Sequence, residues 1–207
     1  MIDSATFIVF VLGALALVAS PGPDFLYVLS RGIAQGPKAG VLSAFGISLG
    51  LLAHTTLATL GLTVLLQTSF VAFQIVKFAG AIYLVYLGVK MLRSEGFSGQ
   101  SERPALKTSA IVRQAMLTNV FNPKAALTFL AFLPQFVKTG HGGTSTQVLI
   151  LGITLVLLAL MWFSLVGTFA GAIGTWLQQR PRFSGRVQRL TGSVLIALGV
   201  RLALARR

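Results

Sequence analysis

A run of 38 residues, 39–76, contains no Lys, Arg, Asp or Glu, and this run constrains the fold of the chain more than any other feature. A helix of roughly 20 apolar residues crosses the ~30 Å hydrocarbon core of a bilayer. The run therefore supplies most of two membrane spans, with Gln67, Thr68 and Ser69 as the polar turn between them. Only 10% of the residues are charged, against about 25% in soluble domains. These proportions predict a protein whose surrounding solvent is lipid.

Apolar segments elsewhere extend this to an all-α membrane protein of six transmembrane helices, near 4–20, 41–66, 70–92, 111–137, 147–174 and 187–205. The segments are continuously apolar and lack the two-residue alternation of a membrane barrel. No Lys or Arg precedes the first segment, which favours a retained helix over a signal peptide. A hydrophilic loop at 93–110 separates a unit at 1–92 from a unit at 111–207.

The two units resemble each other in sequence. GISLGLLAH at Gly46–His54 matches GITLVLLAL at Gly152–Leu160 at six of nine positions, and LGVK before the loop matches LGVR in the last segment. Pro21 and Pro123 align at a similar offset. Chance similarity between Leu- and Gly-rich helices is the alternative. Duplication of a three-helix unit would insert the second copy upside down, as two inverted repeats, an arrangement found in many secondary transporters.

Basic residues indicate the orientation, because cytoplasmic loops are enriched in Lys and Arg. The predicted topology places eleven on one side and four on the other, and the richer side is assigned to the cytoplasm. Both termini are then extracytoplasmic. The net charge of +13 is explained by this asymmetry, since the basic residues cluster at the ends of apolar runs. No nucleic-acid partner is predicted.

The segment SPGPDF, Ser20 to Phe25, predicts a break in the first helix. Proline lacks the backbone N–H and clashes with the preceding turn, so Pro21, Gly22 and Pro23 cannot continue a regular helix. Such a break at membrane depth needs protein or water partners for its freed backbone groups. Pro23 can begin a new helical segment with Asp24 in its first turn. The structural alternative is a helix end at the interface, with Asp24 as a capping residue.

FNPKAALTF, Phe121 to Phe129, repeats the pattern in the fourth helix. Asn122 is a good N-cap and Pro123 a good first helical residue. The break lies inside an apolar run, which makes Lys124 an intramembrane charge that we expect to face a cavity. The alternative is that its ammonium reaches an interface.

Four further residues are weaker candidates. Lys77 lies inside the third helix but within reach of an interface, and His54 in the second helix is either a proton carrier or a hydrogen-bond partner of a neighbouring helix. Gly46 and Gly50 are spaced to allow close helix approach. The chain has no Cys, and nothing in the placement of its two His residues supports a metal site. No cofactor is predicted.

These motifs resemble the bacterial lysine exporters and homoserine/threonine-resistance proteins, the LysE/RhtB-type translocators. The resemblance covers nearly the whole chain and rests on SPGPDF, the Gly46–Gly50 helix, KFAGAIYLVYLGVKMLR at Lys77–Arg93 and FNPKAALTF, in this order. It implies a plasma-membrane exporter of amino acids or their small derivatives, in exchange for protons. The residue after the Pro-Gly-Pro varies within that family, so the resemblance assigns Asp24 no universal role.

The sequence thus predicts export of an amino acid or small derivative across the bacterial inner membrane by proton antiport, from a chain that is not an enzyme. The predicted substrate-binding residues surround the two breaks: Ser20, Gly22, Pro23, Asp24, Asn122, Pro123 and Lys124. Asp24 and His54 are the candidates for proton coupling. A passive channel, an exporter of another small solute and, least favoured, a membrane-embedded enzyme are the alternatives. The prediction is compatible with a homo-oligomer.

Overall fold

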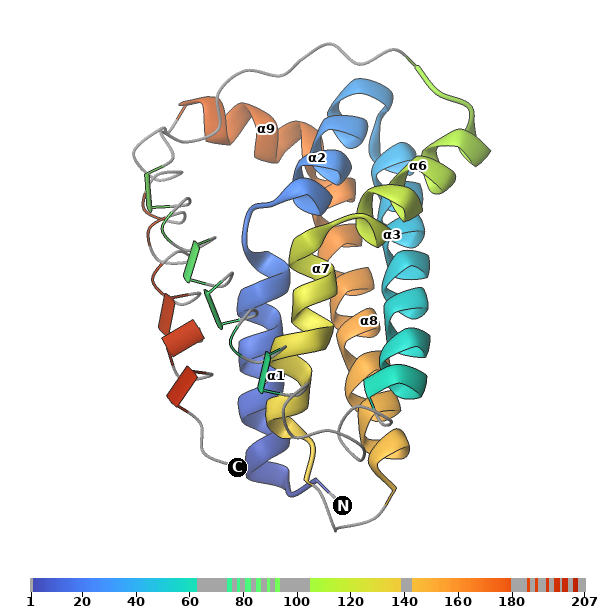
Figure 1. Ribbon diagram of the computed structural model, residues 1–207. Coiled ribbons are helices and arrows are strands. Elements are labelled where there is room, and N and C mark those ends of the chain that lie inside the picture. The colour runs from blue at the N-terminus through green and yellow to red at the C-terminus, as the bar shows by residue number, and fades with distance from the viewer. Residues whose placement is uncertain are drawn as a thin grey trace.

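A computed structural model describes residues 2–62, 105–138 and 143–179 continuously, with isolated positions between 74 and 93 and between 186 and 204 (Figure 1). All secondary structure in these ranges is helical, which confirms the all-α prediction. The elements of the first half are α1 (Ser4–Ala19), α2 (Pro23–Gln35) and α3 (Pro37–Leu57), which continues as the π-helical turn η1 (Ala58–Leu62). Those of the second half are α6 (Thr108–Val120), α7 (Pro123–Leu127), η2 (Thr128–Phe132), η3 (Leu133–Phe136), α8 (Thr144–Thr168) and α9 (Ala170–Gln179).

Among the described residues, two helices are long and apolar enough to cross a membrane, Pro37–Gly61 and Thr144–Thr168, with mean hydropathies of 1.6 and 2.6. The bent pair of α1 and α2 makes a third candidate, with an angle of 55° between its helices. The spans predicted near 70–92 and 187–205, the hydrophilic loop and Lys77 lie largely or wholly outside the described residues. The six-helix inverted repeat therefore remains a prediction.

Both predicted proline breaks are present. The first separates α1 from α2, and α2 then ends at Gly36, whose φ of 82° suits glycine, before Pro37 begins α3. The second separates α6 from α7. The span predicted at 111–137 with a break at Pro123 has this break, and beyond it the helix is further divided into α7, η2 and η3, with Pro134 near the start of η3.

The helices α1, α3, α7 and α8 lie side by side along one direction, and α2, α6 and α9 gather at one end of them (Figure 1). Small residues bring α3 close to its neighbours. A methyl group added at Gly46 would lie 2.4 Å from the Val112 carbonyl oxygen of α6, and one added at Gly40 would lie 2.5 Å from Cα of Gly167 in α8. Close backbone contacts at these points hold α3 of the first half against α6 and α8 of the second.

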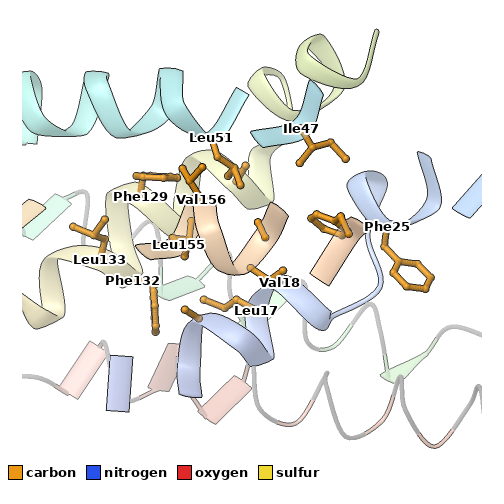
Figure 2. Close-up of a cluster of buried hydrophobic side chains, with 14 of the residues drawn as sticks. Leu17, Val18, Phe25, Ile47, Leu51, Phe129, Phe132, Leu133, Leu155 and Val156 are labelled. Carbon is orange, nitrogen blue, oxygen red and sulfur yellow. The ribbon is translucent and has the colours of Figure 1, made fainter. Parts of the chain in front are cut away.

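Apolar side chains from α1, α3, η2 and α8 fill the space between these helices (Figure 2). The rings of Phe10, Phe132 and Phe136 pack together, with centroid separations of 4.9 to 5.6 Å. Phe10 and Phe132 are fully buried. This packing holds α1 against the continuation of α7, and so brings the two helix breaks to the same level of the fold.

At the opposite end from α2 and α6, an ion pair joins the start of α1 to the end of η3. Asp3 Oδ2 lies 2.5 Å from Lys138 Nζ, and Asp3 Oδ1 accepts the Thr6 N–H as the N-cap of α1. The Lys138 ammonium and the Thr6 donors hold the pKa of Asp3 well below its usual range. Because the folded value is the lower one, this stabilisation is present at neutral pH and is lost only as the pH falls into the acid range.

Candidate functional site

The two helix breaks face each other, and each contributes a charged side chain that contacts the other break. Lys124 lies in the first turn of α7, and its Nζ donates to the Ser20 carbonyl oxygen at 2.9 Å and to the Ser20 hydroxyl. Ser20 is buried, and its hydroxyl donates onward to the Leu17 carbonyl. A Cβ at Gly22 would lie 3.5 Å from Lys124 Nζ, so the break backbone borders the ammonium closely. Lys124 thus satisfies backbone and side-chain acceptors of the first break.

Asp24 makes the reciprocal contact from the first turn of α2. Its Oδ2 accepts from Asn119 Nδ2 and from Asn122 Nδ2, each at 2.9 Å. Its Oδ1 is buried and has no hydrogen-bond partner among the described residues. The N-cap position of α2 is held by Gly22, and within the described residues the hydrogen bonds to Asp24 come from two side-chain amides at the second break. The carboxylate therefore serves the contact between the breaks and leaves one oxygen available.

Asn122 is the N-cap of α7, as the sequence predicts. Its Oδ1 accepts the Lys124 N–H at 3.0 Å and caps α7, while Pro123 occupies the first helical position. The same side chain donates through Nδ2 to Asp24. Pro23 starts α2 in the equivalent way, and both prolines are exposed. They shape the breaks, whereas Asn122 joins them.

A cavity borders both charged residues. Its walls are mainly apolar and come from α1, α2, α3, α7, η2 and α8: Leu17, Val18, Asp24, Leu51, Lys124, Ala125, Thr128, Leu155, Ala159 and Phe163. Centres of water-sized molecules can occupy about 30 Å³ of it, which is room enough for water. Within the described ranges, Asp3 and Lys138 lie within the 4 Å between nitrogen and oxygen that defines an ion pair, whereas Asp24 and Lys124 lie farther apart than this. The two charges of the cavity are thus separate binding groups.

The structure also identifies Asn119, which the sequence analysis missed. This residue of α6 is fully buried, donates to Asp24, and accepts His54 Nε2 at its backbone oxygen at 3.3 Å. The His54 ring also stacks on Phe129, with 5.6 Å between centroids. His54 therefore hydrogen-bonds a neighbouring helix, at the same residue, Asn119, whose side chain contacts Asp24. A second Asn three positions before Asn122, in the same apolar span, was the available signal.

The remaining sequence candidates have separate positions. Gly46 and Gly50 face α6, and Gly50 lies directly against Asn119. Lys77 is outside the described residues. No three His, Asp or Glu side chains in the described segments gather closely enough to hold a metal ion.

Comparison with known proteins gives matches over nearly the whole chain. The family model described as LysE type translocator matches residues 15–206. A leucine efflux protein of Enterobacter sp. (strain 638) is 36% identical over 94% of this chain and 93% of its own length. The uncharacterized membrane protein YrhP of Bacillus subtilis (strain 168) is 32% identical, over 93% and 95%. A leucine efflux protein of Klebsiella pneumoniae is 31% identical, over 95% and 94%. No solved structure gives a significant match.

Proposed function

Because this chain belongs to the LysE type translocator family, and is thus a membrane transporter and not an enzyme, we propose that it exports an aliphatic amino acid from the bacterial cytoplasm in exchange for protons. The observation that carries this proposal is the pair of opposite charges at the meeting of the two helix breaks. A zwitterion needs one group for its ammonium and one for its carboxylate. Asp24 and Lys124 are such a pair and border one cavity.

The substrate ammonium is assigned to Asp24. The buried Oδ1 has no hydrogen-bond partner in the described part of the chain, and such a group gains from a cationic donor. The substrate carboxylate is assigned to Lys124, whose ammonium now rests on Ser20. Backbone N–H groups of α7 are a weaker alternative, because Asn122 already caps the Lys124 N–H.

The substrate side chain is assigned to the apolar walls. Leu17, Val18, Leu51, Leu155 and Phe163 offer no hydrogen-bonding group to a polar side chain. Burial of an aliphatic side chain against them contributes about 25 cal/mol per Å² of apolar surface. The names of two relatives, both leucine efflux proteins, agree with this assignment. Leucine is therefore the first substrate to test.

Proton exchange is assigned to Asp24. A carboxylate that binds the substrate ammonium in its charged form and takes up a proton when the site is empty exchanges one cation for the other. His54 lies on the opposite side of Asn119 and is the next candidate. Competition of proton and substrate for one acid is sufficient for antiport and needs no second ion site.

The end of the molecule that carries α2 and α6 is assigned to the cytoplasm of an inner-membrane protein. Arg31, Lys38, Lys107 and Arg113 belong to the elements at this end, whereas Lys138 lies at the other. With six spans in two inverted three-helix repeats, both termini lie on the extracytoplasmic side. The two breaks then meet inside the membrane, where a binding site between repeats is expected.

The proposal is tested with a panel of labelled amino acids in cells that lack or express the protein. Expression should lower the accumulation of leucine and other aliphatic amino acids, and leave that of charged amino acids unchanged. Asp24→Asn should abolish the difference, whereas Asp3→Asn, a matched change at an exposed acid, should preserve it. Purified protein in liposomes should show saturable counterflow of leucine. Flux without counterflow would indicate a channel, and equal effects on all amino acids would contradict the assigned site.

A further inference from the structure

Asn119 and Gly50 face each other across the interface between α6 and α3. Asn119 is fully buried, and a methyl group added at Gly50 would lie 2.6 Å from Asn119 Oδ1 and 2.8 Å from its Cβ. Real Cβ atoms are not found at such distances. The amide of Asn119 therefore occupies space that exists because residue 50 has no side chain.

The Asp24 carboxylate decides which end of the amide faces it, because a carboxylate oxygen accepts from an N–H. With Oδ1 against Gly50, Nδ2 is directed at Asp24 Oδ2 and donates at 2.9 Å. The reverse orientation would put a carbonyl oxygen against a carboxylate oxygen. Asn122 donates to the same Oδ2, so the two amides hold one carboxylate oxygen from two positions of the second break. The second oxygen, Oδ1, is left without a partner among the described residues.

We propose that Asn119 is a positioning residue, which holds the Asp24 carboxylate so that Oδ1 is available to the substrate ammonium, and that Gly50 is the glycine that makes room for it. This inference rests on the proposed function, in which Asp24 binds the ammonium. With one donor lost, the carboxylate can turn about the remaining contact to Asn122, and its geometry for the ammonium is lost. Each charged hydrogen bond held in place corresponds to about tenfold or more in binding.

Other charged or titratable groups near Asp24 are Lys124 on α7 and His54 on α3. Neither occupies the position of the Asn119 amide, since Lys124 Nζ contacts Ser20 and His54 contacts the Asn119 backbone oxygen. The backbone contact of His54 should survive truncation of the Asn119 side chain. Substitutions at Asn119 and Gly50 thus act on Asp24 through one hydrogen bond.

The test is [¹⁴C]leucine counterflow in proteoliposomes of the full chain, with KM and maximal rate measured separately. Asn119→Ala and Gly50→Ala should each raise KM about tenfold, with a smaller change in maximal rate. Gly152→Ala is the matched control, because its added methyl would lie 2.5 Å from Cγ2 of Thr55, a side chain on another face of α3. This variant should lower the thermal unfolding midpoint as Gly50→Ala does and leave KM unchanged.

A double variant, Asn119→Ala with Gly50→Ala, separates positioning from general damage. If both act through the same hydrogen bond, KM of the double variant should equal that of Asn119→Ala, whereas independent effects would multiply. An unchanged KM in Asn119→Ala, or an equal rise in Gly152→Ala, would overturn the inference. Asp24→Asn, measured in the same assay, distinguishes failure of the positioning role of Asn119 from failure of the proposed binding site. A raised KM there with normal KM in Asn119→Ala refutes positioning alone, and an unchanged KM in Asp24→Asn refutes the proposed site itself.

Discussion

At the scale of single residues, the substitution Asp24→Asn separates proton coupling from folding. Asn can still accept both amide contacts through its one carbonyl oxygen, so the breaks should keep their geometry. It cannot release a proton. We expect efflux driven by an imposed pH gradient to fall at least tenfold, with leucine exchange retained to a larger extent because exchange needs no net protonation change. Normal pH-driven efflux at matched protein amounts would remove Asp24 from the mechanism and leave His54 as the candidate.

Ser20 occupies the Lys124 ammonium, to which the substrate carboxylate is assigned in the proposed function. Its carbonyl and hydroxyl both accept from Nζ, so a substrate carboxylate must displace them. Ser20→Ala removes one of the two acceptors, and a hydrogen bond to a charged group contributes about 1.5–3 kcal/mol. We expect KM for leucine counterflow to fall about tenfold or more. A rise in KM would instead show that the Ser20 hydroxyl contacts the substrate directly.

Much of this site could be predicted from residue types. Proline-containing breaks and a charge inside an apolar run are visible in the sequence, and they led to Ser20, Asp24, Asn122 and Lys124. Asn119 could not be predicted with the same force, because a polar residue in an otherwise regular helix has no backbone signature. Its role depends on a glycine 69 positions earlier, and only the packing of α3 on α6 brings the two together.

At the scale of elements, α2 and α6 are joined by a clamp at the basic end. The Gln35 amide donates to the Leu106 carbonyl and accepts the Leu106 N–H, each at 2.9 Å, and Arg31 Nη1 donates to Gln35 Oε1 at 3.2 Å. Tyr27 adds a contact to the Ile111 carbonyl of α6 at 3.1 Å. Because the backbone of Leu106, just before α6, is held by this clamp, we expect the clamp to determine the local stability of the first turn of α6.

The clamp predicts a local effect of Gln35→Ala. Loss of the two backbone contacts should cost about 1–3 kcal/mol locally and speed amide hydrogen exchange at Leu106 and in the first turn of α6. Gln135→Ala is the control, since its amide donates to Ala131 within its own segment at 3.0 Å. Exchange measured by mass spectrometry should rise near 105–110 in the first variant only. Unchanged exchange there would show that other contacts hold the start of α6.

The sequence was less informative about element boundaries than about element type. Apolar content predicted the helices α1, α3, α6 and α8, and the prolines predicted the break between α6 and α7. The further division into α7, η2 and η3 was not predicted, nor was the length of α2, whose 13 residues lie between two predicted spans. Hydropathy averages over a window and is insensitive to such interruptions. Proline positions located the breaks, whereas the length of each piece follows from tertiary packing.

At the scale of the whole molecule, orientation can be tested directly because the chain contains no Cys. Single variants Thr108→Cys and Thr144→Cys place a thiol at the start of α6 and of α8, at opposite ends of the fold. A maleimide that cannot cross membranes should label Thr144→Cys in intact cells, and Thr108→Cys only after the membrane is opened. The reverse pattern would invert the orientation, and labelling of both in intact cells would contradict a single fixed topology.

The contact of Lys124 with Ser20 has a consequence for how a cell would use such a protein. A carrier whose binding cation is already occupied by its own backbone responds weakly to low substrate, since every molecule bound must first win that competition. At the proposed site, the internal contact raises the amino-acid concentration at which export is half-maximal. The protein would behave as an overflow valve, which spares the working pool of an amino acid and discharges the excess, with no separate sensor required.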